Sequence, residues 1–284
     1  MATPVIAHPV ETLRQYVTDI EAAILLCLDK PDKKPVHRLR TTTRRIEAQI
    51  ALLTILHVPK VRSQEAQRAR RLLKKIRRAA AEVRDLDVQQ DQIAAHTPAN
   101  ARTEARQLRE NLAQQRTKAA EALVSALKKH HTKLAQTLES LMKVFGEIEP
   151  LTLTSAQLAM LTLNWFARNA PAPSDDPDSL HTIRKKAKIA RYLAENAPKQ
   201  ARSTRRIAAA FESLQEIGGE WHDWLVLSGI ARDEIGEASP LTKAFTRRCA
   251  RTLATYRSCL ATGTPIAQEH PGAQSLQPES TARP

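Results

Sequence analysis

The fold of this chain is decided by the stretch VHRLRTTTRRIEAQIALL, Val36 to Leu53, which carries two patterns at once. Residues three, four and seven positions apart lie on one side of an α-helix, because they are separated by about one or two turns. One side therefore collects His37, Arg40, Thr41 and Arg44. An apolar stripe collects Leu39, Ile46, Ile50 and Leu53. We expect this helix to pack in a bundle and to present positive charge to a partner.

A second stretch, LHTIRKKAKIARYLAEN from Leu180 to Asn196, is a weaker copy of the first. Here too a histidine follows an apolar residue, and basic residues follow the histidine at helical spacing. The basic side collects His181, Arg184, Lys185 and Lys188, and the apolar positions are Ile183, Ala187 and Ala190. A second helix with one core side and one cationic side is therefore predicted.

The composition favours an all-α fold. The chain has 284 residues with only seven glycines and 4% aromatic residues, so its core must consist mainly of Leu, Ile, Val and Ala. The 44 Lys and Arg residues outnumber the 30 Asp and Glu residues, which leaves a formal net charge of +14. A surplus of this size favours a polyanionic partner such as nucleic acid, anionic lipid or a phosphate polymer.

Several classes of protein are not favoured by the sequence. Cys27, Cys249 and Cys259 form no C-x-x-C motif and are predicted to be small buried residues. His130 and His131 have no Glu or Cys at metal-ligand spacing, so neither a metal site nor a cofactor is predicted. We see no signal-peptide pattern and no apolar run of about 18 to 20 residues. We therefore expect a cytoplasmic protein without a membrane partner.

Apolar periodicity and proline positions divide the chain into helices. We expect them at about 10–28, 36–57, 60–84, 100–145, 155–170, 180–196 and 240–260. RDLDV, Arg84 to Val88, is expected to interrupt a helix, with Asp85 capping the next one. A further helix from about Lys199 is expected to break at Gly218-Gly219, and Asp178 or Ser179 is expected to cap the second histidine helix. Residues 263–284 are expected to form a disordered tail.

Two further groups of basic residues lie outside the histidine helices. Residues 60–84 hold ten basic and two acidic side chains, the densest positive segment of the chain. Helical spacing places four of them in one row, namely Arg71, Lys74, Lys75 and Arg78. The segment after Pro198 adds Arg202, Arg205 and Arg206. Such rows are usually solvated helix faces, and for the 60–84 segment we weigh that interpretation equally against ligand binding.

The order of these features suggests an internal repeat. Each half contains a histidine helix, a second basic helix and then an Arg-Asp or His-Asp pair, at Arg84-Asp85 and His222-Asp223. Three features in the same order are harder to obtain by chance than one motif. We therefore expect a single domain over 10–262 with two related helical halves, about 10–150 and 151–262. A pseudo-twofold axis between them would let the two basic sides converge on one central cavity.

Four blocks of the sequence resemble the signature blocks of the CHAD domain family and occur in that family's order. They are VHRLRTTTRRIEAQI, EVRDLDV, LHTIRKKAKIARY and LQEIGGEWHDWLVL, and the resemblance covers about residues 10–262. It implies two pseudo-symmetric helical bundles around a basic central channel that binds inorganic polyphosphate. Family members are associated with polyphosphate granules, and some are fused to a CYTH triphosphatase domain.

The resemblance also implies a set of polyphosphate-binding residues. Its basic positions fall on His37, Arg40, Arg44, Arg84, His181, Arg184, Lys185, Lys188, Arg191 and His222. To these we add the two rows described above, Arg71, Lys74, Lys75, Arg78, Arg202, Arg205 and Arg206. Thr41 stands where the second copy has Lys185, and GGEWHDW replaces a shorter glycine turn. Asp85 and Asp223 are expected to cap a helix or orient a cation, and Trp221 and Trp224 to be core residues.

Catalysis is not indicated. A triphosphatase needs acidic residues to hold Mg²⁺ against its substrate, and the only near match to the E-x-E-x-K signature is Glu147-Ile148-Glu149, which lacks the lysine. There is no phosphate-binding P-loop and no G-x-S-x-G. The leading hypothesis is non-enzymatic polyphosphate binding, with targeting to polyphosphate granules. The alternative is a nucleic-acid-binding protein that uses the same basic surface non-specifically.

Overall fold

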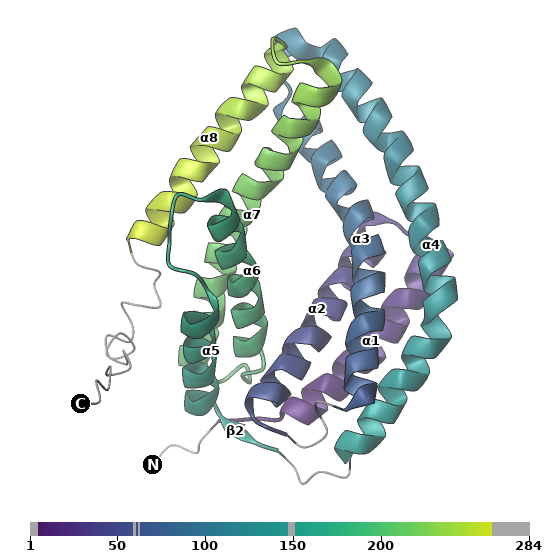
Figure 1. Cartoon of the computed structure of the whole chain (residues 1–284), viewed down its shortest axis with the longest axis vertical. Helices are drawn as coiled ribbons and strands as arrows, with labels where there is room; N and C mark the ends of the chain where they lie inside the picture. The colour runs from purple at the N-terminus through teal and green to yellow at the C-terminus, as the bar shows by residue number, and fades with distance from the viewer. Residues whose placement is uncertain (1–4, 59–60, 62, 147–150, 263–284) are drawn as a thin grey trace, which may run out of the picture.

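The computed structural model describes residues 5–58, 61, 63–146 and 151–262, and this part of the chain is all-α as expected (Figure 1). Its helices are α1 (Pro9–Asp29), α2 (Lys33–Ile55), α3 (Gln64–His96), the 3-10 turn η1 (Ala99–Ala101), α4 (Arg102–Gly146), α5 (Ser155–Asn169), α6 (Pro177–Ala194), α7 (Arg202–Ile235) and α8 (Pro240–Ala261). Two short strands, β1 (Ile6–Ala7) and β2 (Leu153–Thr154), pair antiparallel. The predicted tail falls outside the described residues.

The helices begin where side chains can satisfy their free N–H groups. Ser63 accepts from the N–H of Ala66 at the start of α3, and Ser239 caps α8, which opens with a proline. At the start of α5, Thr154 and Gln157 form a capping box. For α6 the predicted cap was wrong, because Asp176 is the N-cap and accepts from the N–H of Ser179.

Two predicted helix breaks are also wrong. α3 continues through RDLDV without interruption, and Asp85 lies in mid-helix, paired with Arg40 rather than capping. α7 continues through Gly218-Gly219. A Cβ atom on Gly218 would lie 2.7 Å from the ring of Tyr256, so this glycine allows α8 to pack closely against α7. Close helix packing accounts for Gly218, although a glycine pair in a sequence usually signals a turn.

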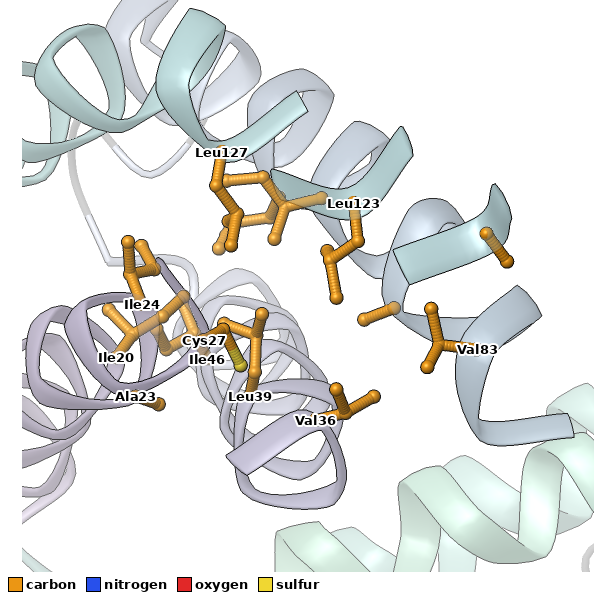
Figure 2. Packing of buried hydrophobic residues seen from close by; sticks show 14 of the residues in the cluster. Ile20, Ala23, Ile24, Cys27, Val36, Leu39, Ile46, Val83, Leu123 and Leu127 are labelled. Atoms are coloured by element: carbon orange, nitrogen blue, oxygen red, sulfur yellow. The ribbon is translucent and has the colours of Figure 1, made fainter. Parts of the chain in front are cut away.

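The largest core cluster joins α1 to α4. Figure 2 shows part of it, where α1, α2 and α4 bring Ile24, Leu39 and Leu127 toward one another. The cysteine of this cluster, Cys27, is buried as predicted, whereas Cys249 and Cys259 are only half-buried. Helix α4 packs along α3 over much of the length of α3 (Figure 1). The apolar side of α2 packs into this cluster, so its cationic side faces away from the cluster.

The second cluster joins α5, α6, α7 and α8, and the two clusters meet along α7. Trp221 belongs to the second cluster and Trp224 to the first, and both are core residues as predicted. A third cluster lies where α2, α5 and α6 meet the two strands, and contains Leu52 and Leu193. The pseudo-twofold axis and the division near residue 150 stay predictions. In the described ranges, no helix combines the length and apolar character needed to cross a bilayer.

Candidate functional site

The cationic sides of the two histidine helices meet in a cavity of about 420 Å³ between α2, α3, α6 and α7. We call it the interhelical cavity. Its basic lining residues are His37, Arg40, Arg44, Arg84, Arg184, Lys188 and Arg191. All seven were expected site residues, and they come from positions 37 to 191 of the chain. The structure thus brings the two copies of the histidine helix together around one space.

The lining also contains carboxylates. Besides six Lys and Arg residues it includes Asp85 on α3 and Glu216, Glu220 and Asp223 on α7. Nη1 of Arg40 lies 3.1 Å from Oδ1 of Asp85, which holds that guanidinium group at the cavity wall. The cationic helices α2 and α6 therefore share the cavity with an acidic row on α7, whose members are three or four residues apart.

Three cavity arginines bury a nitrogen atom that has no hydrogen-bond partner within the described part of the chain. These atoms are Nη1 of Arg40, Nε of Arg44 and Nε of Arg184. Nη1 of Arg40 has its ion-pair contact with Asp85 but not the geometry of a hydrogen bond to it. A buried donor without an acceptor is costly, and such groups are rare in folded proteins. Donors of this kind around one cavity indicate that the site is arranged for an anionic ligand.

The cavity cations also lower one another's pKa values. Burial lowers the pKa of Lys188 to about 7, and the positive charges of Arg44, Arg184 and Arg40 add to this effect. Burial, with Arg40 and Arg77 nearby, lowers the pKa of Arg44 to about 10. The pKa of Arg184 is lowered as well, chiefly by burial. These groups are crowded, like-charged and only partly solvated, so a polyanion that enters the cavity would relieve their repulsion.

The remaining two predicted histidines form a pair near the cavity. The rings of His181 and His222 lie 4.4 Å apart, and Nδ1 of His181 accepts from Nη2 of Arg184 at 3.3 Å. Burial and the nearby positive charges of Arg184 and Lys185 lower the pKa of both histidines to about 4. Burial also lowers the pKa of His37. At neutral pH the three histidines are therefore uncharged in the free protein.

The structure leaves the other predicted basic residues outside the cavity lining. Lys185 is exposed, although it is close enough to lower the pKa values of the histidine pair. The exposed remainder comprises Arg71, Lys74, Lys75 and Arg78 on α3 and Arg202, Arg205 and Arg206 on α7. We call the four α3 residues the α3 surface row. They point away from α2 because their spacing places them on the solvated side of α3.

Apart from Arg84, sequence reasoning missed the side of α3 that faces α2. Arg70, Arg77 and Arg84 are seven residues apart, so they share one face. Arg70 donates to the hydroxyl of Thr54 at 2.9 Å, Arg77 pairs with Glu47, and Arg84 lines the cavity. The seven-residue spacing of these arginines was the signal that the sequence offered, but the prediction was based on the denser basic row beside them. The acidic row on α7 was also missed apart from Asp223.

A cluster of paired charges lies beside the cavity and shares Arg191 with its lining. Arg191 donates from Nε to Glu195 at 2.7 Å, and its Nη2 lies 2.7 Å from Oε1 of Glu212. Nη2 of Arg45 lies 3.4 Å from Oε2 of Glu195, which links α2 to α6. We call Arg45, Arg191, Glu195 and Glu212 the ion-pair cluster. Its two cations and two anions neutralise each other. Burial lowers the pKa of Arg191, but Glu195 and Glu212 outweigh burial and raise it.

Metal ligands are not assembled in the described ranges, where no group of three or more His, Cys, Asp or Glu side chains could hold an ion. His130 and His131 are half-buried. The Glu147-Ile148-Glu149 stretch lies outside the described residues.

Comparison with known proteins identifies the family. A CHAD domain model matches residues 11–232. The crystal structure of the CHAD domain from the plant Ricinus communis is similar with a TM-score of 0.65 and 19% identity, over 98% of this chain and 95% of that one. PptA from Streptomyces chartreusis is similar with a TM-score of 0.52 and 16% identity, over 94% and 99%. No curated protein matches the sequence. Because the family model covers most of the sequence, the chain belongs to the CHAD domain family.

Proposed function

We propose that this protein binds inorganic polyphosphate in the interhelical cavity without transforming it. The observation that carries the proposal is the set of buried donors on Arg40, Arg44 and Arg184 that make no hydrogen bond within the described residues. Each would gain a phosphate oxygen as acceptor. Membership of the CHAD domain family, known in general for binding polyphosphate, supports the same ligand.

The chemistry of the lining suits a chain of phosphates. An arginine guanidinium group donates to two phosphate oxygens at once, and a lysine supplies a compact charge that can follow the chain. The lining offers both, with Arg40, Arg44, Arg84 and Arg184 beside Lys188. Polyphosphate has no base or sugar, so it fits a narrow cavity between helices more readily than nucleic acid does. We further propose that binding directs the protein to polyphosphate granules in the cytoplasm.

The carboxylates support binding rather than catalysis. Asp85 is paired with Arg40, and Asp223 lies close enough to Arg184 and Lys188 for these cations to oppose the effect of burial on its pKa. Both aspartates therefore have cations to orient. We accordingly propose that they position the basic side chains and that the protein is not an enzyme.

The alternative function, non-specific nucleic-acid binding, rests on different residues. The α3 surface row and Arg202, Arg205 and Arg206 are exposed, where they could contact the phosphates of a nucleic acid too wide for the cavity. The two functions are therefore separable by mutation as well as by ligand.

The deciding experiment is competition binding at about physiological ionic strength, where loose surface pairing is screened. Labelled long-chain polyphosphate is bound first, and duplex DNA, single-stranded RNA or tripolyphosphate is then added at equal phosphate concentration. We expect the polyphosphate complex to survive both nucleic acids. If either nucleic acid displaces polyphosphate at equal concentration, the basic groups act as a general polyanion surface and the cavity proposal fails.

A further inference from the structure

Lys188 lines the interhelical cavity with an amine that has no partner in the described ranges. The residue lies on α6 and is half-buried. Within those ranges its Nζ makes neither a hydrogen bond nor an ion pair. Other lysines do have a carboxylate, such as Lys33 with Asp91 and Lys143 with Glu139. The nitrogen of Lys188 is therefore unoccupied beside an open space.

The surroundings of this amine favour its neutral form. Burial lowers the pKa of Lys188 from 10.5 to about 7. The positive charges of Arg44, Arg184 and Arg40 add to the effect, and Asp223 opposes it. About half of such amines are neutral at pH 7, against roughly 1 in 3,000 for an ordinary lysine. A neutral amine is a nucleophile, and crowding by other cations is one way in which proteins activate a lysine.

Two arginines beside the amine can hold a phosphate group. Arg184 lies one turn before Lys188 on the same face of α6, and Arg44 lines the same cavity from α2. The Nε atom of each arginine is buried and makes no hydrogen bond within the described residues. A guanidinium group can donate to two phosphate oxygens at once. A phosphate held by this pair would lie next to the nitrogen of Lys188.

The reactive compounds that fit this arrangement are acyl phosphates. In these compounds a single oxygen joins the phosphate to an electrophilic carbonyl carbon, so anchoring the phosphate brings that carbon toward Nζ of Lys188. An acyl thioester of coenzyme A carries its phosphates far from the acyl carbon, and the same anchors would hold that carbon away. The two charges of the small phosphate are balanced by the two arginines, and the amine stays half-buried. Its neutral fraction is therefore retained better than beside a long polyphosphate chain.

We propose that Lys188 is a modification site that accepts the acyl group of an acyl phosphate, with Arg44 and Arg184 holding the phosphate. Nζ forms a bond to the carbonyl carbon, and the bond between that carbon and the bridging oxygen breaks. Inorganic phosphate leaves with the electron pair of the broken bond. The proton that the nitrogen loses ends on the released phosphate. The product is a neutral amide in place of an amine that can carry charge.

The modification would act on the cavity itself. An amide cannot pair with a phosphate and also occupies part of the cavity, so acylation should weaken polyphosphate binding by at least about tenfold. This consequence rests on the polyphosphate-binding function proposed above, whereas the chemistry at Lys188 does not. Thiols compete poorly for the acyl group, because burial raises the pKa of Cys27 to about 12 and also raises the pKa values of Cys249 and Cys259.

The test incubates the full chain with acetyl phosphate at pH 7 and measures the initial acetylation rate of each lysine by peptide mass spectrometry. Lys188 should react at least about tenfold faster than Lys74 and Lys75, the exposed controls on the α3 surface row. Added inorganic phosphate should slow the reaction of Lys188 selectively, because it occupies the two arginines. Equal rates at the three lysines, or a rate at Lys188 that phosphate leaves unchanged, would overturn the inference.

A double variant tests the anchors. Arg44→Gln with Arg184→Gln should slow acetylation of Lys188 by acetyl phosphate at least about fivefold more than acetylation by N-acetylimidazole, which has no phosphate. Comparing the two reagents cancels the effect of the arginines on the amine itself. Arg71→Gln with Arg78→Gln, on the α3 surface row, is the matched control and should leave the ratio of the two rates unchanged. An unchanged ratio in the folded cavity variant would contradict the anchoring, and if that variant does not fold, phosphate competition in the wild type decides.

This inference and the proposed function can fail separately. Selective acetylation of Lys188 in a protein that binds no polyphosphate would support the modification site and refute the proposed function. Polyphosphate binding without selective acetylation would do the reverse.

Discussion

The cavity cations and the α3 surface row consist of the same residue types at the same helical spacing, yet they are in opposite physical states. Arg40, Arg44, Arg184 and Lys188 are half-buried, face one another and include donors without partners. Every residue of the α3 surface row is exposed to solvent. Solvated charges interact weakly and are screened by salt. Charges held together in a partly dry space are costly, and a ligand of opposite charge would compensate them beyond what the nearby carboxylates do.

The difference shows why local charge density is a poor guide to a binding site. The α3 surface row belongs to the densest positive segment of the sequence, but each of its charges is already compensated by water. The cavity cations come from separate helices and are mixed with four carboxylates. What distinguishes them is the unfavourable free energy of holding like charges together in a partly dry cavity, which the proposed anionic ligand would relieve.

The largest expected effect comes from reversing charges in the two regions. Arg40→Glu with Arg184→Glu should weaken polyphosphate binding by at least about 100-fold, because two donors are lost and two repulsive charges enter the same cavity. Arg71→Glu with Arg78→Glu makes the same change in net charge on the α3 surface row. It should weaken binding by less than about threefold at physiological ionic strength. Fluorescence anisotropy with labelled polyphosphate measures both.

Circular dichroism of each variant checks that helical content is retained, since a misfolded protein would mimic lost binding. Equal losses in the two double variants would show that total charge governs affinity. The comparison between a cavity and a solvated row would then be wrong.

The next effect concerns stability in the absence of ligand. Lys188 has an ordinary pKa of 10.5 in the unfolded chain and about 7 in the fold, so folding releases its proton between these values. Because the unfolded state binds more protons, stability rises as the pH increases from about 7 toward 10. Lys188→Met should remove this rise and stabilise the protein by about 1–3 kcal/mol at pH 7. Thermal melts at several pH values measure it.

Lys75→Met is the matched control, because Lys75 belongs to the α3 surface row. The free energy of unfolding of this variant should stay within about 0.5 kcal/mol of the wild-type value and keep the same dependence on pH. If Lys188→Met were destabilising at pH 7, burial of this charge would not be costly, and the physical contrast between the two regions would disappear.

Binding should couple to the same proton. A phosphate beside Lys188 raises the pKa of its amine, so the complex takes up a proton that the free protein has partly lost. Affinity should therefore fall as the pH rises above 7, by up to about tenfold per unit. The histidines, with lowered pKa values, stay neutral in this range and do not contribute. Calorimetry in buffers of different ionisation enthalpy measures the uptake.

Two variants of α6 separate this effect from general electrostatics. Lys188→Gln should bind more weakly and lose the pH dependence, whereas Lys185→Gln, at an exposed position of the same helix, should keep it. Proton uptake that persists without Lys188 would assign the titration to another group.

The sequence was sufficient to predict the fold class and the two helices that matter most. Apolar residues at helical spacing determine which side of α2 is buried, so the opposite side, with His37, Arg40 and Arg44, could be identified directly. The meeting of α2 with α6 followed from the repeat and from the family resemblance. Periodicity alone could not provide it, because no local pattern specifies which distant helix lies opposite.

The errors arose where a residue's role depends on a partner far away in sequence. Gly218 was taken for a helix break because the tyrosine that needs its small size lies on α8, at Tyr256. Asp85 was expected either to cap a helix or to orient a cation, and the sequence could not decide between these roles because its partner Arg40 lies on another helix. In each case a local rule was correct for an isolated helix, and tertiary packing reversed the result.

The smallest expected effect concerns salt. Lys74→Gln with Lys75→Gln removes two members of the α3 surface row and should change polyphosphate affinity by less than about twofold at physiological ionic strength, because exposed charges beyond the Debye length of about 8 Å are largely screened. At tenfold lower salt the screening length grows, so the difference in polyphosphate affinity between this variant and the wild type should become larger. At this low salt concentration, the double variant should lose more affinity for duplex DNA than for polyphosphate, because DNA can contact only the exposed rows. If polyphosphate loses as much as DNA, the row takes part in binding, and the cavity is only one portion of a longer cationic path.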